Sequence, residues 1–136
     1  MMISKMIHTD ADIPRYEIWR RRPTLLISVL IEECEALIEH TEFLKGFSER
    51  ELSYISAKAK GSHSLAARYA AKRGAELISN LPWYCFEVAR GPEGIPHLKG
   101  REERTCAHLT TAPIILSLTH DEPYALAYLF STSSPR

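Results

Sequence analysis

One segment constrains the fold of this chain more than any other, and it reads SLAARYAAKRGAE from Ser64 to Glu76. Alanine is the strongest helix former, so its repetition here predicts a helix, which Pro82 would end. The small side chains would let another backbone approach this helix closely. The segment also carries three cations, Arg68, Lys72 and Arg73. It therefore predicts a closely packed helix whose surface suits an anion.

The composition limits the class of protein. The 136 residues fit one domain, and 17 basic residues against 17 acidic ones leave no net charge to favour nucleic acid or a membrane. The three cysteines lie far apart, without the spacing of a zinc site or a disulfide framework, which is typical of the reducing cytoplasm. The apolar run from Thr24 to Ile31 is too short to span a bilayer. We therefore expect a soluble cytoplasmic domain.

The first half of the chain predicts mainly helices. A short strand is expected at residues 3–8, and the apolar spacing of residues 16–44 predicts one kinked helix, or two in succession, interrupted at Pro23. Ser48 and Glu51 have the spacing of a capping box, which would begin a further helix that runs to about Lys60.

The second half predicts two strand pairs. One pair joins residues 83–90 to residues 95–98, and the other joins residues 114–119 to residues 124–130. A short helix is expected between the pairs, at residues 101–109. Helices followed by antiparallel strands, with one early strand to join the sheet, indicate an α+β fold in which helices pack on an antiparallel sheet. We expect one domain over residues 1–130 and a flexible tail over residues 131–136.

Five blocks of sequence occur along the chain in a characteristic order. They are TDADIPRY (9–16), FSEREL (47–52), SLAARYAAK (64–72), WYCFEV with GIPHLKG (83–100) and LSLTHDEPYALAYL (116–129). Together they resemble the holo-acyl-carrier-protein synthase type of 4′-phosphopantetheinyl transferase. The resemblance implies a small α+β domain, usually a homotrimer with its active sites between subunits. It also implies transfer of phosphopantetheine from coenzyme A to a serine of an acyl carrier protein, a step of fatty acid or polyketide biosynthesis.

This family usually neutralises phosphate charge with a divalent metal, Mg²⁺, held by carboxylates. Asp10, at the end of a strand, matches the first metal-ligand aspartate, although a turn or helix-capping aspartate is the alternative. Arg73 stands where the family has its metal-ligand glutamate, and a cation there would repel a metal. Glu76, one turn later, could hold the metal instead, or Arg73 could clamp the diphosphate. Alternatively, Arg73 faces solvent or pairs with Glu76.

The resemblance also assigns residues around coenzyme A. Arg68 and Lys72 match positions near the nucleotide, and His120 matches a histidine near the pyrophosphate. Pro96 matches the turn beside the adenine, although a hairpin could use the same turn. His120 could alternatively be a turn histidine. We expect one anion-binding cleft that gathers Arg68, Lys72, Arg73 and His120.

Acyl carrier proteins are acidic, so a docking surface for them is expected to be basic. Arg15 matches an arginine that contacts the carrier. A basic cluster follows it at Arg20, Arg21 and Arg22, and the alternative is a solvated run of charge. The apolar strands at residues 114–119 and 124–130 predict a homo-oligomer, and the resemblance makes it a trimer.

Three functions remain open from the sequence. The first is a divergent phosphopantetheinyl transferase, which the five blocks, Asp10, Lys72 and His120 favour. The second is a relative repurposed for a different reaction on a carrier-bound or small-molecule substrate. The third is a non-catalytic protein that binds the carrier. The replacement at Arg73 favours the second and third functions over the first.

Overall fold

The computed structural model describes residues 4–10, 13–91 and 93–131, with side chains from residue 13 onward. Its main sheet has five strands in the order β1-β2-β3-β7-β6, and every neighbouring pair is antiparallel. These strands are β1 (Ser4–Asp10), β2 (Ile13–Arg21), β3 (Thr24–Leu30), β6 (Ile114–Asp121) and β7 (Tyr124–Ser131). A separate hairpin pairs β4 (Phe86–Arg90) with β5 (Pro96–Gly100).

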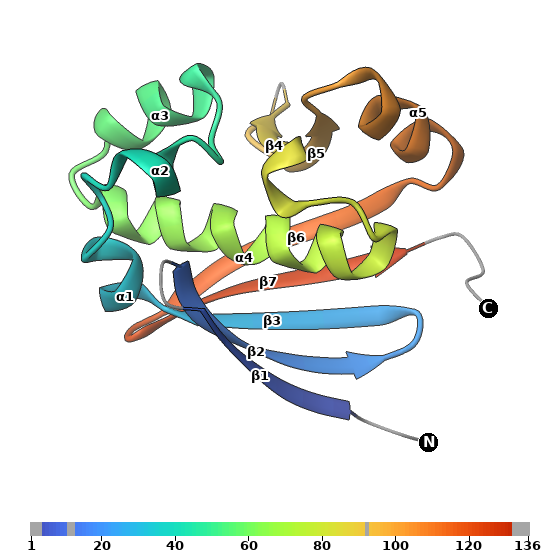
Figure 1. The fold of residues 1–136 in the computed structure, drawn as a ribbon, viewed down its shortest axis with the longest axis horizontal. Coiled ribbons are helices and arrows are strands. Elements are labelled where there is room, and N and C mark those ends of the chain that lie inside the picture. Colours follow the sequence, from blue (N-terminus) through green and yellow to red (C-terminus); the bar gives the residue numbers. More distant parts are fainter. Residues whose placement is uncertain (1–3, 11–12, 92, 132–136) are drawn as a thin grey trace.

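Helices lie on one side of this sheet. The longest, α4 (Gly61–Ser79), lies across the sheet, and the hairpin β4–β5 lies beyond it, away from the sheet (Figure 1). The shorter helices are α1 (Ile31–Glu35), α2 (Thr41–Leu44), α3 (Glu49–Ser56) and α5 (Glu103–Thr111). A 3-10 turn at Trp83–Cys85 precedes β4. The predicted α+β fold, with helices packed on an antiparallel sheet, is confirmed.

Helix α4 packs closely against the sheet because its inner face carries small side chains. Ala66, Ala70, Ala71 and Ala75 are fully buried. At Gly74, an added Cβ would lie 2.6 Å from Cδ1 of Leu129 on β7 and 3.2 Å from Cγ1 of Ile27 on β3. Heavy atoms do not approach so closely in packed interiors. The close approach expected of this helix is therefore made to the sheet.

The predicted helices at residues 16–44 are wrong in their first half. Residues 13–30 form the hairpin of β2 and β3, and Pro23 lies in its turn rather than at a helix kink. On β2, buried Tyr16 and Ile18 alternate with more exposed neighbours, which is the two-residue period of a half-buried strand. The sheet thus has three early strands instead of one, and helix begins only at Ile31.

The remaining elements follow the prediction closely. Ser48 and Glu51 form the capping box of α3, with each side chain bonded to the other residue's backbone N–H. That helix ends at Ser56 rather than near Lys60. Both C-terminal strand pairs and the short helix between them are present. Ser131, expected in the tail, is the last residue of β7, and residues 132–136 lie outside the described residues.

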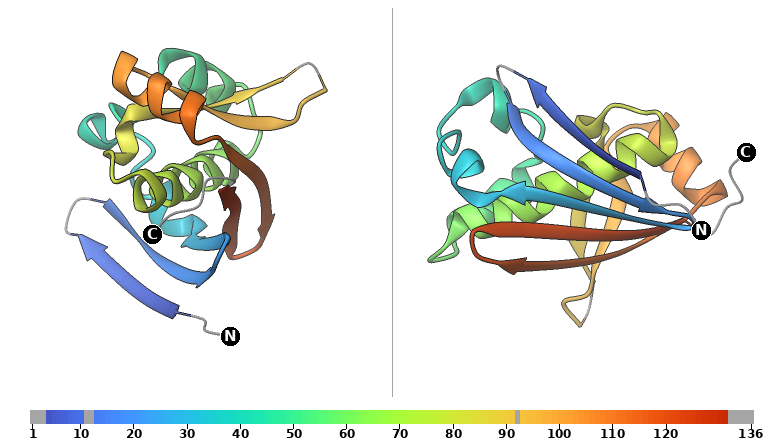
Figure 2. Two further views of the ribbon diagram at one scale, coloured as in Figure 1. Left: turned by 90° about the vertical axis from the view of Figure 1, so that its right-hand side faces the viewer. Right: turned by 90° about the horizontal axis from the view of Figure 1, so that it is seen from below.

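The face of the sheet away from α4 is apolar along β6 and β7. Strand β7 alternates buried Ala125, Ala127 and Leu129 with outward-facing aromatic residues. The exposed apolar side chains on these two strands are Ile115, Tyr124, Tyr128 and Phe130. In Figure 2, this face is left open by the helices that the structure describes. Among those helices, none has both the length and the apolar character needed to cross a membrane.

Candidate functional site: a cationic pocket at the start of helix α4

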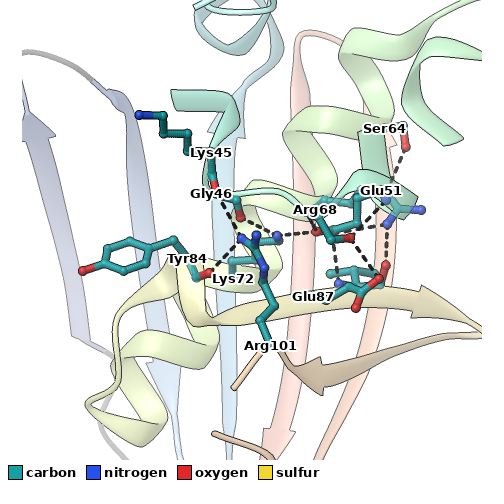
Figure 3. A network of polar contacts seen from close by, with 11 residues as sticks. Lys45, Gly46, Glu51, Ser64, Arg68, Lys72, Tyr84, Glu87 and Arg101 are labelled. Carbon is teal, nitrogen blue, oxygen red and sulfur yellow. Dashed lines mark hydrogen bonds and ion pairs between the residues drawn. The ribbon is translucent and has the colours of Figure 1, made fainter. Parts of the chain in front are cut away.

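A buried carboxylate on α3 organises the cations of α4. Glu51 is 1% exposed, and its Oε1 accepts a hydrogen bond of 2.6 Å from Lys72 Nζ (Figure 3). Its Oε2 accepts a bond of 2.9 Å from the Val88 backbone N–H and lies 3.4 Å from Nη1 of Arg68. Arg68 also donates to the carbonyl oxygen of Val88, and Lys72 donates to that of Gly46. One carboxylate therefore holds two cations and joins α3, α4 and β4.

This network makes Lys72 a core residue. Its side chain is 0% exposed, and burial lowers its pKa to about 8 in spite of the neighbouring Glu51. Burial also lowers the pKa of Arg68. Because Lys72 lies entirely inside the protein, it does not line the cleft expected from the sequence.

Arg68 does reach a surface pocket. A hollow of about 560 Å³ lies between the start of α4, the end of α3 and the strands β4 and β6. Its polar lining residues are Tyr54, Lys58, Lys60, His63, Ser64, Arg68, Arg90, Thr119 and His120. This lining contains cations and histidines but no carboxylate. Such a pocket at the positive end of a long helix suits a phosphorylated ligand.

Two histidines of the pocket lining are in contact with each other. His63, on the first turn of α4, and His120, near the end of β6, have ring centroids 4.9 Å apart in an edge-to-face arrangement. Nε2 of His63 is hydrogen-bonded to Glu122, in the turn between β6 and β7. That contact and Lys60 lower the pKa of the Glu122 carboxyl. His120 thus lines the same pocket as Arg68 and has a second histidine as its neighbour.

Arg73 lies on a different side of α4 and does not line this pocket. Its guanidinium lies over the Tyr16 ring, 4.6 Å from the centroid, and donates to the Tyr16 hydroxyl at 2.9 Å. Its Nε lies 3.3 Å from Oε1 of Glu76, an ion pair without hydrogen-bond geometry. Burial opposes this charge, but Tyr69, Tyr16 and Glu76 outweigh it and raise the pKa of Arg73. Of the alternatives for Arg73, the pairing with Glu76 is the one that the structure contains.

The described residues around Arg73 do not fit a magnesium ion. Glu76, the substitute ligand considered from the sequence, is already paired with the guanidinium, which would repel a metal. Across the side chains that the structure describes, no group of three or more His, Cys, Asp or Glu could hold a metal. Asp10 ends β1 opposite Ile13, as expected of a residue at a strand end, but its side chain lies outside the described residues.

The other predicted site residues are spread over the molecule. Pro96 begins β5 opposite Arg90, next to the turn of the hairpin, and does not line the pocket. Arg15 lies near the start of β2, 56% exposed, and its guanidinium is paired with Glu33. Burial opposes the charge of Glu33, but the bonds from Arg15 outweigh it and lower its pKa.

The cluster of Arg20, Arg21 and Arg22 is not beside Asp10. It lies at the turn that joins β2 to β3, whereas Asp10 pairs with Ile13 at the opposite end of β2. The two lie apart, although they are close in the sequence, because β2 is an extended strand that carries its two ends far from each other.

Sequence reasoning missed four of the residues that make the pocket positive or proton-binding: Lys58, Lys60, His63 and Arg90. Three of them lie within residues 58–63 and the fourth, Arg90, is far along the chain, and their spacing matches no recognised motif. The sequence contained one local signal near this pocket. Glu122 follows His120 by two residues, which places an imidazole and a carboxylate at the same turn.

Comparison with known proteins agrees with this architecture. No protein-family model matches the chain. The chain is 34% identical over 106 residues to the holo-acyl-carrier-protein synthase of Caldicellulosiruptor bescii, which covers 73% of this chain and 88% of that protein. It is 32% identical over 93 residues to the enzyme of the same name from Geobacter sulfurreducens, covering 62% and 74% of the two chains.

Solved structures of such synthases share the fold. The synthase of Neisseria meningitidis matches 82% of this chain and 98% of its own with a TM-score of 0.70 at 16% identity. That of Helicobacter pylori, in complex with coenzyme A, matches 80% and 99% with a TM-score of 0.66 at 19% identity. With the curated relatives above 30% identity, these likenesses show that the chain belongs to the holo-acyl-carrier-protein synthase family of 4′-phosphopantetheinyl transferases.

Proposed function

We propose that this protein transfers phosphopantetheine from coenzyme A to a serine of an acyl carrier protein. The observation that carries the proposal is the carboxylate-free cationic pocket at the start of α4. Coenzyme A is a polyanion, and the lysines and arginines of this pocket come from the α3–α4 connection, α4 and β4, so they can contact several phosphate oxygens at once. Relatives named holo-acyl-carrier-protein synthase support the same reaction.

In this reaction the serine hydroxyl attacks the β-phosphorus of coenzyme A. A bond forms between the serine oxygen and phosphorus, and the bond to the bridging oxygen breaks, which releases adenosine 3′,5′-bisphosphate. The hydroxyl proton passes to solvent. Lys58, Arg90 and His120 would neutralise phosphate charge and hold the nucleotide in place. Arg68 would contact the ligand with its orientation fixed by Glu51 and Val88.

A metal is not needed for this binding step. Arg73 provides a fixed positive charge where the family pattern has a metal-ligand glutamate, and Glu76 and Tyr16 hold that charge in place. We therefore expect coenzyme A to bind in the absence of Mg²⁺.

The protein would act in the cytoplasm as a homo-oligomer. The family resemblance favours a trimer. The open sheet face of Ile115, Tyr124, Tyr128 and Phe130 is suited to burial against further copies of the chain. Assembly would also bring together two cations that face different sides of one protomer. Arg68 and Arg73 are five residues apart on α4, about 140° around the helix, and so face different sides of one protomer. A neighbouring copy could bring the two sides together.

The acidic carrier protein would dock beside Arg15. This arginine is exposed and is held by Glu33, close in the chain to Asp10. Arg20, Arg21 and Arg22 lie at the other end of β2 and would belong to a separate part of the docking surface.

Arg73 favours a second candidate, a relative that binds the carrier but no longer performs transfer. The guanidinium occupies the metal-ligand position and is tied to Glu76, so the usual metal chemistry has no place there. This candidate keeps the basic docking surface and loses only the reaction.

Intact-mass measurement of apo carrier protein separates these functions. The carrier would be incubated with coenzyme A and this protein, with Mg²⁺ in one reaction and a chelator in the other. A mass gain of one phosphopantetheine in both reactions is the expected result. Carrier binding without any mass gain would support the second candidate. A gain that needs Mg²⁺ would contradict the role given to Arg73.

A further inference from the structure

The His63 side chain has one nitrogen without a partner in the described structure. Nδ1 of His63 is buried and makes no hydrogen bond, while Nε2 is bonded to Glu122. Buried polar atoms are nearly always hydrogen-bonded, so an orphaned one at a pocket calls for a missing partner. His63 lines the cationic pocket, and a ligand there would be that partner.

The chemistry of imidazole decides which partner fits. Because the Glu122 carboxylate accepts a hydrogen bond from Nε2, that nitrogen carries a proton. In neutral His63, Nδ1 would then be an acceptor, whose lone pair would face the oxygen lone pairs of a phosphate. In doubly protonated His63, Nδ1–H is a donor and the ring is a cation, which suits a phosphate oxygen.

We propose that His63 is a phosphate-binding residue and that a phosphate group of the ligand enters this pocket together with a proton on Nδ1 of His63. The proposal rests on the proposed function for the identity of the ligand, coenzyme A. Glu122 acts as a positioning residue, because its carboxylate fixes the ring orientation and stabilises the imidazolium. The edge-to-face contact with His120 places both imidazoles at one side of the pocket.

The other charged side chains around His63 are of types that do not ordinarily titrate near neutral pH. The charged and titratable groups that face it are Tyr54, Lys58, Lys60, Arg68, Arg90, His120 and Glu122. Among these residue types, histidine is the one that ordinarily titrates between pH 5 and 8. A change in ligand affinity over that range would therefore report on His63, His120 or the ligand itself.

The test measures proton uptake on binding. Coenzyme A would be titrated into the metal-free protein by calorimetry in several phosphate-free buffers that differ in ionisation enthalpy, at about pH 7.5, above the middle of the histidine range. Because the ligand also titrates, the quantity of interest is the difference between the wild type and His63→Gln, which keeps a group able to bond Glu122. His120→Gln measures the share of the second histidine. His108→Gln, on α5 and outside the pocket lining, is the matched control.

We expect the wild type to take up more protons than His63→Gln, and its affinity to fall more steeply as the pH rises, by up to about tenfold per pH unit for one linked proton. In wild-type protein with labelled histidine nitrogens, the NMR signal of His63 should change to that of an imidazolium when coenzyme A is added. Equal proton uptake in the two proteins, or a His63 signal that stays neutral in the complex, would overturn the proposal.

Failure of the proposed function gives a different result. If coenzyme A produces no binding heat, the same titrations would be made with inorganic pyrophosphate. Pyrophosphate binding with proton uptake that depends on His63 would keep the phosphate site and discard coenzyme A as its ligand. Absence of binding by both probes would overturn the phosphate site together with its ligand.

Discussion

The cations around α4 form two sets with the same charge and different surroundings. The buried set, Arg68, Lys72 and Arg73, has side chains between 0% and 12% exposed, and each member has a carboxylate partner. The pocket set, Lys58, Lys60 and Arg90, is exposed and lines the cavity. Burying a charge is costly without a partner, whereas an exposed charge remains solvated and available to a ligand. The cations of the helix motif therefore mainly stabilise the fold. Lys58, Lys60 and Arg90, which belong to no motif, are the ones available to a ligand.

Removal of the central carboxylate should give the largest effect. Glu51→Ala would leave Lys72 and Arg68 as buried charges with no counter-ion, and we expect the free energy of unfolding to fall by about 3 to 5 kcal/mol. Urea unfolding followed by circular dichroism measures this. Glu49→Ala, an exposed glutamate on the same helix, is the control and should cost less than about 1 kcal/mol. Similar losses in the two variants would show that Glu51 does not hold Arg68 and Lys72 in place.

Charge reversal at Arg73 should come next. Arg73→Glu would remove a cation from between Tyr16 and Glu76 and place a carboxylate against Glu76, which we expect to cost about 2 to 4 kcal/mol. Because the variant restores an acidic residue at the metal-ligand position, Mg²⁺ should raise its melting temperature. The wild type should show no such shift, and Arg73→Lys serves as the charge-keeping control. A wild-type shift as large as that of the variant would mean that Arg73 does not exclude the metal.

The buried lysine should make stability depend on pH. Burial lowers the pKa of Lys72 to about 8 from 10.5, so between these values the unfolded chain binds more protons than the folded protein does. The contribution of this group to the free energy of unfolding therefore rises with pH across that window, by up to about 1.4 kcal/mol per pH unit. Unfolding curves at several pH values give the slope. Lys72→Met should have a flatter slope, whatever its absolute stability, and an unchanged slope would contradict the assignment.

Loss of one pocket cation should have the smallest effect, and on affinity alone. Arg90→Ala should weaken coenzyme A binding by about 1 kcal/mol, because a partly solvated charge-assisted contact is lost, and leave the melting temperature nearly unchanged. Lys99→Ala, an exposed cation on β5 outside the pocket lining, removes the same charge from the neighbouring strand. Calorimetric titration of coenzyme A into each variant measures the two affinities. An equal loss of affinity in Lys99→Ala would show that overall charge, rather than the pocket, attracts the ligand.

Much of the fold could be predicted because its signals are local. The capping box at Ser48, the alanine-rich helix and the two C-terminal strand pairs are each specified by residues close together in the chain. The β2–β3 hairpin was missed because the run from Thr24 to Ile31 is apolar at almost every position, and such a run fits a buried strand or a helix equally well.

The site was harder to predict because its decisive contacts are not local. Nothing in the sequence around Lys72 shows that Glu51, 21 residues earlier, folds onto it and removes it from the surface. His63 and Glu122 are 59 residues apart, so their pairing also depends on the complete fold. Replacement of the metal-ligand glutamate by Arg73 could be read directly, because a family resemblance compares residue types at matched positions.

The close contact at Gly74 links the positions of two cations of α4, Arg68 and Arg73. This glycine lies next to Arg73 and less than two turns from Arg68, and it sets how near α4 can come to Leu129 and Ile27. An added methyl group there would crowd Leu129 and Ile27, because side chains in a close-packed interior have little free space. Either these side chains or α4 would have to shift, and a shift of α4 would move Arg73 relative to Tyr16 and Arg68 relative to the pocket. The positions of these two cations thus depend on the absence of a side chain at residue 74.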